Sequence, residues 1–145
     1  MNMLRNVELV MKVQDKLLNP IAKEYDLALQ ELKIMIFLKN SRECDIAQNI
    51  VKSLGLTKSH VSMSIASLEQ KGYLEKTQDH SDKKKYHLKL TERSQDAVKA
   101  GLDVQKRIKK IMMEGITPNE LQVLADVTKK MLDNLEKYSQ QKGEK

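Results

Sequence analysis

The stretch between Asp45 and Thr91 constrains the fold of this 145-residue chain more than any other part of it. Its first half holds two short segments with an apolar stripe, separated by Gly55. Its second half holds two alternating segments separated by a polar, lysine-rich run. Apolar residues that recur every three or four positions indicate helices, and strict alternation indicates strands. The stretch therefore predicts two short helices joined by a tight turn, followed by a β-hairpin.

The turn between the two predicted helices is marked by residues that begin and end helices. Asp45 can cap the first helix with its carboxylate, and Gln48 can complete a capping box. Gly55 follows where the backbone must reverse, because glycine adopts a left-handed conformation without steric cost. Thr57 is the expected N-cap of the second helix, which ends at Gly72. The residues expected to face inward are Ile46, Ile50, Val51 and Leu54, then Val61, Ile65 and Leu68.

The outward face of the second helix carries short or flexible side chains, and all but one of them are polar. Most lie in the N-terminal half, the part of a recognition helix that enters the major groove of DNA. Serine and histidine can hydrogen-bond to base edges or phosphates, and a helix N-terminus attracts phosphate. Two packed helices with a solvated outer face would show the same pattern. The outward residues are Lys58, Ser59, His60, Ser62, Met63 and Ser67.

A β-hairpin is predicted over residues 73–90, directly after the second helix. The run from Asp79 to Lys84 favours a turn, because it contains Asp and Ser. Strands are therefore expected on both sides of this run, and the second alternates clearly. Its two sides are expected to carry Tyr86, Leu88 and Leu90 on one face and Lys85, His87 and Lys89 on the other.

Three consecutive lysines, Lys83, Lys84 and Lys85, put positive charge at the tip of the hairpin or just beyond it. The negative potential of a narrow minor groove attracts such side chains. Asp82 could pair with the ammonium group of Lys84 and hold it in position. A lysine run alone usually forms only solvated surface, but this run lies one hairpin away from a candidate recognition helix. The two features together favour binding to duplex DNA.

The order of these elements and two short motifs resemble the MarR family of bacterial transcription regulators. The wing of that family typically reads D-x-R, five residues, and L-T before a helix. The same spacing joins Asp82-Lys83-Lys84 to Leu90-Thr91 here. The segment 58–74 is similar to the family's recognition helix and first wing strand. One departure is Lys84, which replaces the usual wing arginine and offers a point charge instead of a planar group with several donors.

The resemblance covers nearly the whole chain and implies its fold class. That class is mostly α with a small β-hairpin wing, in which a winged helix-turn-helix is flanked by N- and C-terminal dimerisation helices. Residues 1–145 would then form a single MarR-like domain. Within it, residues 28–91 would be the DNA-binding lobe, and residues 1–25 and 92–140 the helical dimerisation region.

Helical periodicity before the lobe agrees with this organisation. Residues 3–18 predict a first helix with a wide apolar band, and Pro20 is expected to perturb its end. Residues 28–39 predict a second helix that is apolar on most sides and should be the most buried element.

Helical periodicity also returns after Thr91, the expected N-cap of a long helix that Gly115 stops. The run Thr117–Glu120 is the clearest helix start in the chain, with a capping box and Pro at the first helical position. The first helix and the last two carry more apolar surface than the lobe can cover. They predict a homodimer interface, and the alternative is that they pack only on one another within one chain. A dimer would place two recognition helices against half-sites about one DNA turn apart.

The composition agrees with a nucleic-acid partner, and the sequence lacks the motifs of metalloproteins and of common enzyme classes. The net charge is +6, and residues 52–89 contain eight lysines but four acidic residues. Neither a metal-ligand cluster nor a catalytic or phosphate-loop motif is visible, which predicts no cofactor, no metal and no enzymatic activity. The histidines His60, His80 and His87 are expected to be surface groups or DNA contacts.

Cellular location is also indicated by sequence. The single Cys44 excludes an internal disulfide framework and fits a reducing cytoplasm. It reads as an inert thiol, with a redox sensor as the alternative. The chain shows neither a signal peptide nor an apolar run near the roughly 20 residues of a membrane span, so a cytoplasmic protein is expected.

These features predict a sequence-specific DNA-binding transcription regulator, a repressor that binds a pseudo-palindromic operator as a homodimer. The resemblance also implies a small-molecule effector, which would bind between the dimerisation helices and the lobe and shift the population away from the DNA-competent state. The alternative is a winged-helix module that binds a protein partner without needing the lysine tip. The predicted DNA contacts are Lys58, Ser59, His60, Ser62, Met63 and Ser67 on the helix and Lys83, Lys84 and Lys85 on the hairpin.

Overall fold

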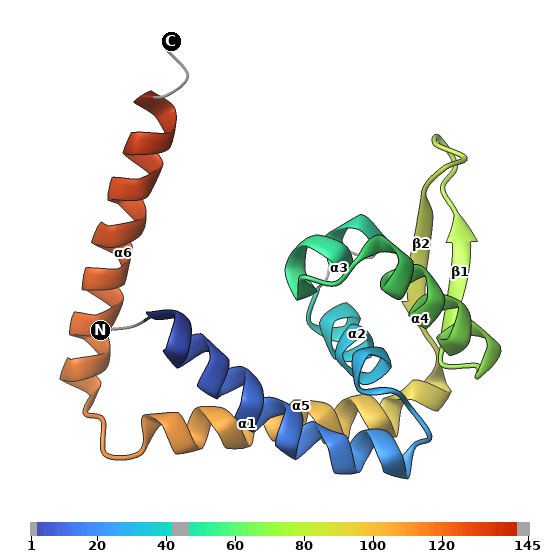
Figure 1. The fold of residues 1–145 in the computed structure, drawn as a ribbon, viewed down its shortest axis with the longest axis horizontal. Coiled ribbons are helices and arrows are strands. Elements are labelled where there is room, and N and C mark those ends of the chain that lie inside the picture. Colours follow the sequence, from blue (N-terminus) through green and yellow to red (C-terminus); the bar gives the residue numbers. More distant parts are fainter. Residues whose placement is uncertain (1–2, 42–46, 142–145) are drawn as a thin grey trace. The chain divides into compact units, whose positions relative to one another are not determined.

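The computed structural model describes residues 3–41 and 47–141, which are mostly helical (Figure 1). The chain divides into two compact units, residues 1–109 and residues 110–145. The helix α5 begins in the first unit and ends in the second. In chain order the elements are α1 (Met3–Glu24), α2 (Leu29–Asn40), α3 (Ala47–Leu54), α4 (Lys58–Gln70), β1 (Leu74–Gln78), β2 (Tyr86–Leu90), the short 3-10 helix η1 (Glu92–Ser94), α5 (Gln95–Met113) and α6 (Pro118–Gln141).

The core of the first unit is built around α2, which contacts α1, α3, α4 and β2. Figure 1 shows α2 between the α3–α4 pair and α1. Leu32, Ile34 and Met35 are fully buried, which confirms that this helix is the most buried of the described elements. The inward faces predicted for the next two helices also join this core, through Ile50 in α3 and through Val61, Ile65 and Leu68 in α4.

The helix α1 is longer than the sequence pattern predicts, because it continues through Pro20 to Glu24. Proline removes one backbone hydrogen bond and crowds the preceding turn, which normally ends a helix. Here Leu18 and Ala22, on either side of Pro20, are both buried in the core. The expected helix end near residue 18, perturbed by Pro20, was therefore wrong, and we attribute the continued helix to this tertiary packing.

A buried carboxylate, Glu31, ties α2 to the end of α4. Its Oε2 accepts hydrogen bonds from the Ala28 amide (2.9 Å) and from Lys71 Nζ (3.0 Å). Lys71 also donates to the carbonyl of Asp26 at 2.8 Å. Burial raises the pKa of Glu31, but hydrogen bonds from Ser67, Ala28 and Lys71 outweigh burial and leave that pKa lowered. The network therefore holds a charged group in the interior and fixes the orientation of α4.

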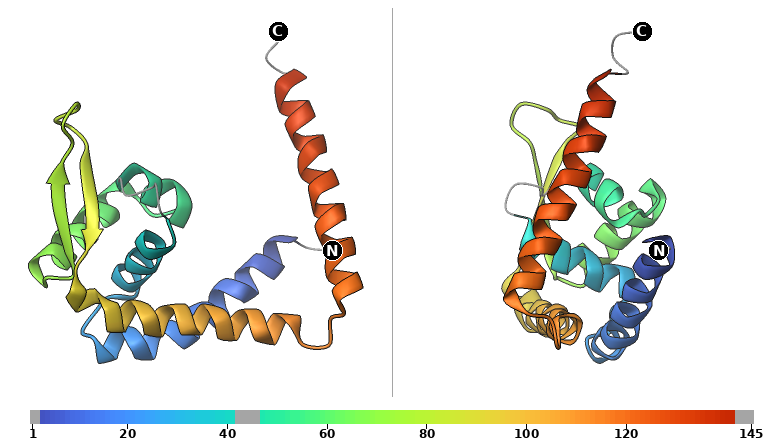
Figure 2. Two further views of the ribbon diagram at one scale, coloured as in Figure 1. Left: turned by 180° about the vertical axis from the view of Figure 1, so that it is seen from behind. Right: turned by 90° about the vertical axis from the view of Figure 1, so that its left-hand side faces the viewer.

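The hairpin pairs β1 with β2 in antiparallel register, from Leu74 opposite Leu90 to Gln78 opposite Tyr86 (Figure 2). Thr91 was expected to cap the following helix, but its side chain makes no capping hydrogen bond. Its hydroxyl instead donates to the carbonyl of Gly72 at 2.6 Å. This correction has a physical cause: the base of the hairpin brings Gly72 beside Thr91, and η1 then precedes α5.

The second unit contains the start signal predicted for the last helix. The Thr117 amide donates to Glu120 Oε2 at 2.8 Å, and the Glu120 amide donates to Thr117 Oγ1 at 3.2 Å. This reciprocal pair confirms the capping box, and Gly115 before it has a left-handed φ of 76°. The large apolar side chains of α6 are exposed in the single chain, namely Val123, Leu124, Val127, Met131, Leu132, Leu135 and Tyr138.

The assignment of residues 1–25 and 92–140 to dimerisation stays a prediction. The predicted cap Asp45, the inward Ile46 and the thiol of Cys44 lie outside the described residues.

Candidate nucleic-acid interface

The turn before α4 has the geometry that its sequence predicts. Gly55 has a φ of 62°, in the left-handed region that glycine favours. Thr57 caps α4, and its Oγ1 accepts a hydrogen bond from the His60 amide at 3.2 Å. The cap fixes the first turn of α4, so the side chains of Lys58, Ser59 and His60 start from a defined backbone.

The outward face of α4 is exposed where the sequence predicts it. Lys58, Ser59, His60, Ser62 and Met63 are all exposed, and Met63 reaches 70 %. A large apolar side chain with this exposure on a polar face is available for contact with a partner. Ser67 is less exposed than these residues, because it is half-buried and hydrogen-bonds to Glu31. Its role in the structure is to stabilise the buried carboxylate.

The tip of the wing is organised by Asp79, which the sequence pattern placed only in a generic turn. Its Oδ2 accepts hydrogen bonds from the Ser81 amide (3.1 Å), the Ser81 hydroxyl (2.8 Å) and the Asp82 amide (2.9 Å). His87 Nε2 lies 2.7 Å from Asp79 Oδ1. The hydrogen bond with His87, followed by those from Ser81 and Asp82, holds the pKa of Asp79 far below its usual range. Asp79 therefore remains a carboxylate that shapes the tip.

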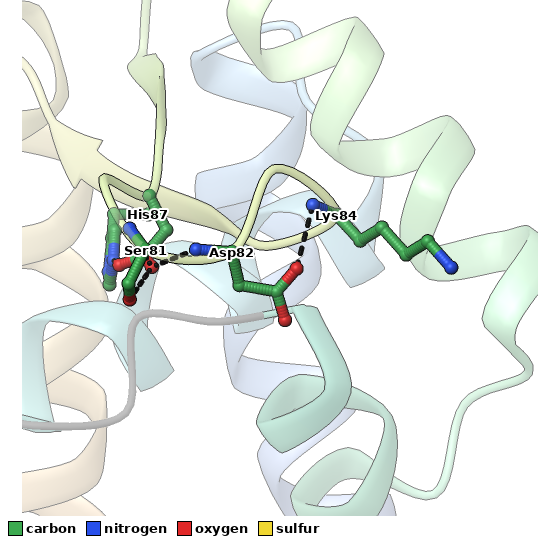
Figure 3. Close-up of polar contacts among 5 residues, drawn as sticks. Ser81, Asp82, Lys84 and His87 are labelled. Carbon is green, nitrogen blue, oxygen red and sulfur yellow. Dashed lines mark hydrogen bonds and ion pairs between the residues drawn. The ribbon is translucent and has the colours of Figure 1, made fainter.

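Asp82 acts on the backbone of Lys84. The sequence predicted that the Asp82 carboxylate would pair with the ammonium group of Lys84, and this was wrong. The Lys84 amide donates to Asp82 Oδ1 at 3.0 Å. The lysine side chain runs away from Asp82 (Figure 3). A carboxylate two residues earlier reaches the amide more easily than the end of a long side chain, as in an Asx-turn. The ammonium group is thus directed outward.

A hollow of about 280 Å³ lies between α4 and the wing. It brings Lys58 and Ser62 of α4 together with Lys84 and Lys85 of the wing. Two members of each group predicted from sequence, on the helix and on the hairpin, therefore border a single site. Ser59, His60 and Met63 do not line the hollow. Lys83 is exposed but does not line the hollow.

Lys76 and Tyr86 also line the hollow, although neither was predicted from sequence to belong to the site. Tyr86 was expected on the same side of its strand as Leu88, and both line the hollow, with Tyr86 40 % exposed. The exposure of Tyr86 follows from its position at the tip end of β2, because Leu74 and Leu88 are the strand residues buried in the core. Lys76 Nζ lies 4.3 Å from the centroid of the Tyr86 ring. The alternation of apolar and basic residues could not reveal this pair without the strand register.

Residues 3–41 and 47–141 were searched for metal sites and for membrane-spanning helices. They contain no group of three or more His, Cys, Asp and Glu side chains arranged to hold a metal ion. Within the same residues, no helix combines the length and the apolar character needed to cross a membrane.

Comparison with known proteins agrees with this geometry. Residues 27–94 match the model of a winged helix DNA-binding domain. The HTH-type transcriptional regulator BilQ of Clostridioides difficile (strain CD3) is 27 % identical over 64 residues. That match covers 44 % of this chain and 43 % of the curated relative, so it spans less than half of either protein.

Solved structures match over nearly the whole chain. A MarR family transcriptional regulator from Listeria monocytogenes, complexed with 26mer DNA, has a TM-score of 0.75 at 24 % identity and covers 93 % of this chain and 89 % of that one. A MarR protein from Peptoclostridium difficile has a TM-score of 0.73 at 23 % identity, covering 95 % and 90 %. The MepR–DNA complex of S. aureus has a TM-score of 0.70 at 16 % identity, covering 92 % and 98 %.

The fold and the site define a winged helix-turn-helix with an exposed recognition-type helix and a basic wing. The chain as a whole has the fold of the MarR transcription regulators, so the resemblance drawn from its wing and recognition-helix motifs is confirmed at the level of the fold.

Proposed function

We propose that this chain is a MarR-type transcription regulator that binds duplex DNA in the cytoplasm and has no catalytic role. One observation carries the proposal: Lys58 and Ser62 in the first half of α4 and Lys84 and Lys85 of the wing border the same hollow. A protein that only presented two packed helices to a protein partner would not need a basic hairpin beside them. Its curated relative is a transcriptional regulator, and two of the similar structures were solved with DNA.

In this proposal α4 enters the major groove and the wing follows the neighbouring backbone or minor groove. His60 and Ser62 offer hydrogen-bonding groups to base edges, which is where sequence is read. Lys83, Lys84 and Lys85 contribute charge, which supplies affinity without sequence information. The Asp79 network holds the hairpin tip in one shape, so the lysines need little ordering on binding.

We further propose that the regulator acts as a homodimer on a pseudo-palindromic operator. The exposed apolar residues of α6, among them Leu124, Val127 and Met131, support a second copy as the covering surface. Two linked lobes bind more tightly than one because the second contact becomes intramolecular.

Repression would follow if the operator overlaps a promoter, since the bound dimer would exclude polymerase. A small-molecule effector would then act by favouring a spacing of the two lobes that does not match the operator.

Titration of a fluorescently labelled mixed-sequence duplex, by anisotropy at several salt concentrations, tests DNA binding. We expect the logarithm of the association constant to fall linearly with the logarithm of the salt concentration, because lysines displace counterions from phosphates. Binding that is absent, or that is insensitive to salt, would overturn the proposal and favour the protein-partner module.

Substitutions distinguish the roles of the helix and the wing. Lys84→Ala should weaken binding to all duplexes and lower the salt slope by about 1 for each bound subunit. His60→Ala and Ser62→Ala should instead change the preference among sequences in a selection from a random library. Equal behaviour of the helix and wing variants in both measurements would contradict this assignment.

A further inference from the structure

The hollow between α4 and the wing is strongly basic. Lysines from two elements line it: Lys58 from α4, and Lys76, Lys84 and Lys85 from the hairpin. Glu69 is the one acidic residue among the lining residues. Four cations against one anion attract a negatively charged group, and the hollow is open to a ligand as large as a phosphodiester.

The position of the hollow indicates which anion it receives. If α4 lies in the major groove and the wing lies in the adjacent minor groove, one sugar–phosphate strand must pass between them. The hollow occupies that place on the protein, and its lysines supply ammonium donors. A phosphate oxygen accepts hydrogen bonds from hydroxyl and ammonium groups alike.

Lys76 differs from the other three lysines because an aromatic ring restrains it. In the hairpin register Lys76 lies opposite Leu88, and Tyr86 is two residues before Leu88, so both side chains lie on the same face. The ammonium group is 4.3 Å from the centroid of the Tyr86 ring, which is within the range of a cation–π contact. The ring therefore holds the cation at the hollow and reduces the side-chain entropy lost on binding a phosphate.

We propose that this hollow seats a backbone phosphate of duplex DNA, that Lys76 is a phosphate contact, and that Tyr86 is its positioning residue. The inference rests on the proposed DNA-binding function and adds two residues outside both the recognition helix and the lysine run.

The hairpin offers a matched control in Lys89. Its register partner is Glu75, one residue from Lys76, so Lys89 lies on the opposite face of the same two strands. Lys76→Gln and Lys89→Gln each remove one positive charge from the hairpin, but Lys89 does not line the hollow.

The experiment measures the affinity of the full chain for a mixed-sequence duplex as a function of salt. We expect Lys76→Gln to lower the salt slope by about 1 for each bound subunit. Lys89→Gln should change the slope by less than half as much. Equal salt slopes for the two variants would overturn the proposal that the hollow holds a phosphate, while leaving the proposed DNA binding intact. Absence of salt-dependent binding by the unchanged chain would instead overturn the proposed function itself.

The role of Tyr86 is tested by a double-mutant cycle. Tyr86→Phe keeps the ring and should bind as the unchanged chain does. Tyr86→Leu removes the ring and should weaken DNA binding severalfold. In a chain that already carries Lys76→Gln, the same change should cause almost no further loss of affinity. Additive effects of the two changes, or a loss in Tyr86→Phe equal to that in Tyr86→Leu, would exclude a positioning role. Far-UV circular dichroism of each variant confirms that the fold is kept.

Discussion

Glu31 shows how a single charged residue can fix the direction of a helix. It is only 4 % exposed, yet its carboxylate is satisfied by the Ala28 amide and by Lys71. A buried carboxylate without such partners would be neutralised or would destabilise the fold. The contacts join α2 to the end of α4, so a buried residue of α2 helps to fix how α4 is held.

Glu31→Gln should reduce the free energy of unfolding by about 1–3 kcal/mol, because the Lys71 ammonium loses its charged partner. Chemical denaturation at neutral pH measures this loss. Glu8→Gln, on the exposed face of α1, is the control and should change stability by less than about 0.5 kcal/mol. Equal stabilities of the two variants would show that the buried network contributes little.

The lowered pKa of Glu31 also predicts a pH dependence. The unfolded chain binds the proton at higher pH than the folded chain does, so Glu31 stabilises the fold above the ordinary carboxyl range. That contribution should be lost as pH falls below about 4. The free energy of unfolding of the unchanged chain should therefore fall more steeply between about pH 5 and about pH 3 than that of Glu31→Gln. Parallel curves would contradict the prediction.

Gly101 in α5 is required by close packing and not by backbone conformation. A Cβ at this position would overlap Ile36 of α2, with Ile36 Cγ1 only 2.8 Å away. Alanine normally favours a helix over glycine by about 1 kcal/mol. Here Gly101→Ala should instead destabilise the chain by about 1–3 kcal/mol through overpacking. Ile36→Val in the same chain should recover part of the loss, as measured by thermal unfolding. Stabilisation by Gly101→Ala alone would show that α2 and α5 can separate without cost.

At the scale of the element, the wing owes its shape to its turn more than to its strands. The strands have five residues each, and only Leu74 and Leu88 among these residues are buried. An isolated two-stranded hairpin is marginally stable in water. The Asp79 carboxylate compensates by binding the backbone amides of Ser81 and Asp82 and the ring of His87.

Asp79→Asn should leave global stability nearly unchanged and loosen the tip of the wing. The neutral amide is a weaker acceptor than the carboxylate for the Ser81 and Asp82 amides. Hydrogen exchange followed by NMR should show faster exchange at Ser81 and Asp82. Asp82→Asn is the control, and it should affect the Lys84 amide instead. Unchanged exchange at Ser81 and Asp82 in Asp79→Asn would contradict this account.

At the scale of the whole molecule, the exposed apolar face of α6 is the surface that we propose to lie in the dimer interface. Leu124, Val127 and Met131 recur at helical spacing and are all exposed in the single chain. Val127→Glu should weaken self-association more than tenfold, because a charge would be buried without a partner. Sedimentation equilibrium measures the change, and DNA affinity should fall with it. Gln140→Glu, on the opposite face of α6, should leave the dimer intact. A monomeric unchanged chain would refute the dimer, and its DNA binding would then be that of a single lobe.

Local sequence rules predicted much of this protein because several of its elements are specified by neighbouring residues. The Thr57 cap, the left-handed Gly55 and the Thr117–Glu120 box involve contacts within a few positions of the chain. The stripe of apolar residues in α4 fixed which face is exposed, and so placed most of the candidate DNA contacts. The same rules did not predict the hydrogen bond between Ser67 and Glu31, because that contact joins two separate helices.

The sequence by itself determined the order of the helices, the turns that join them and the basic character of the wing, because these follow from local hydrogen bonds, periodicity and charge. Tertiary structure alone decided that α1 continues through Pro20, that Thr91 binds Gly72, and that Lys76 meets Tyr86 beside α4. Each of these depends on residues brought together from separate elements. A strand register or a packed core supplies such contacts, and no short stretch of sequence encodes them.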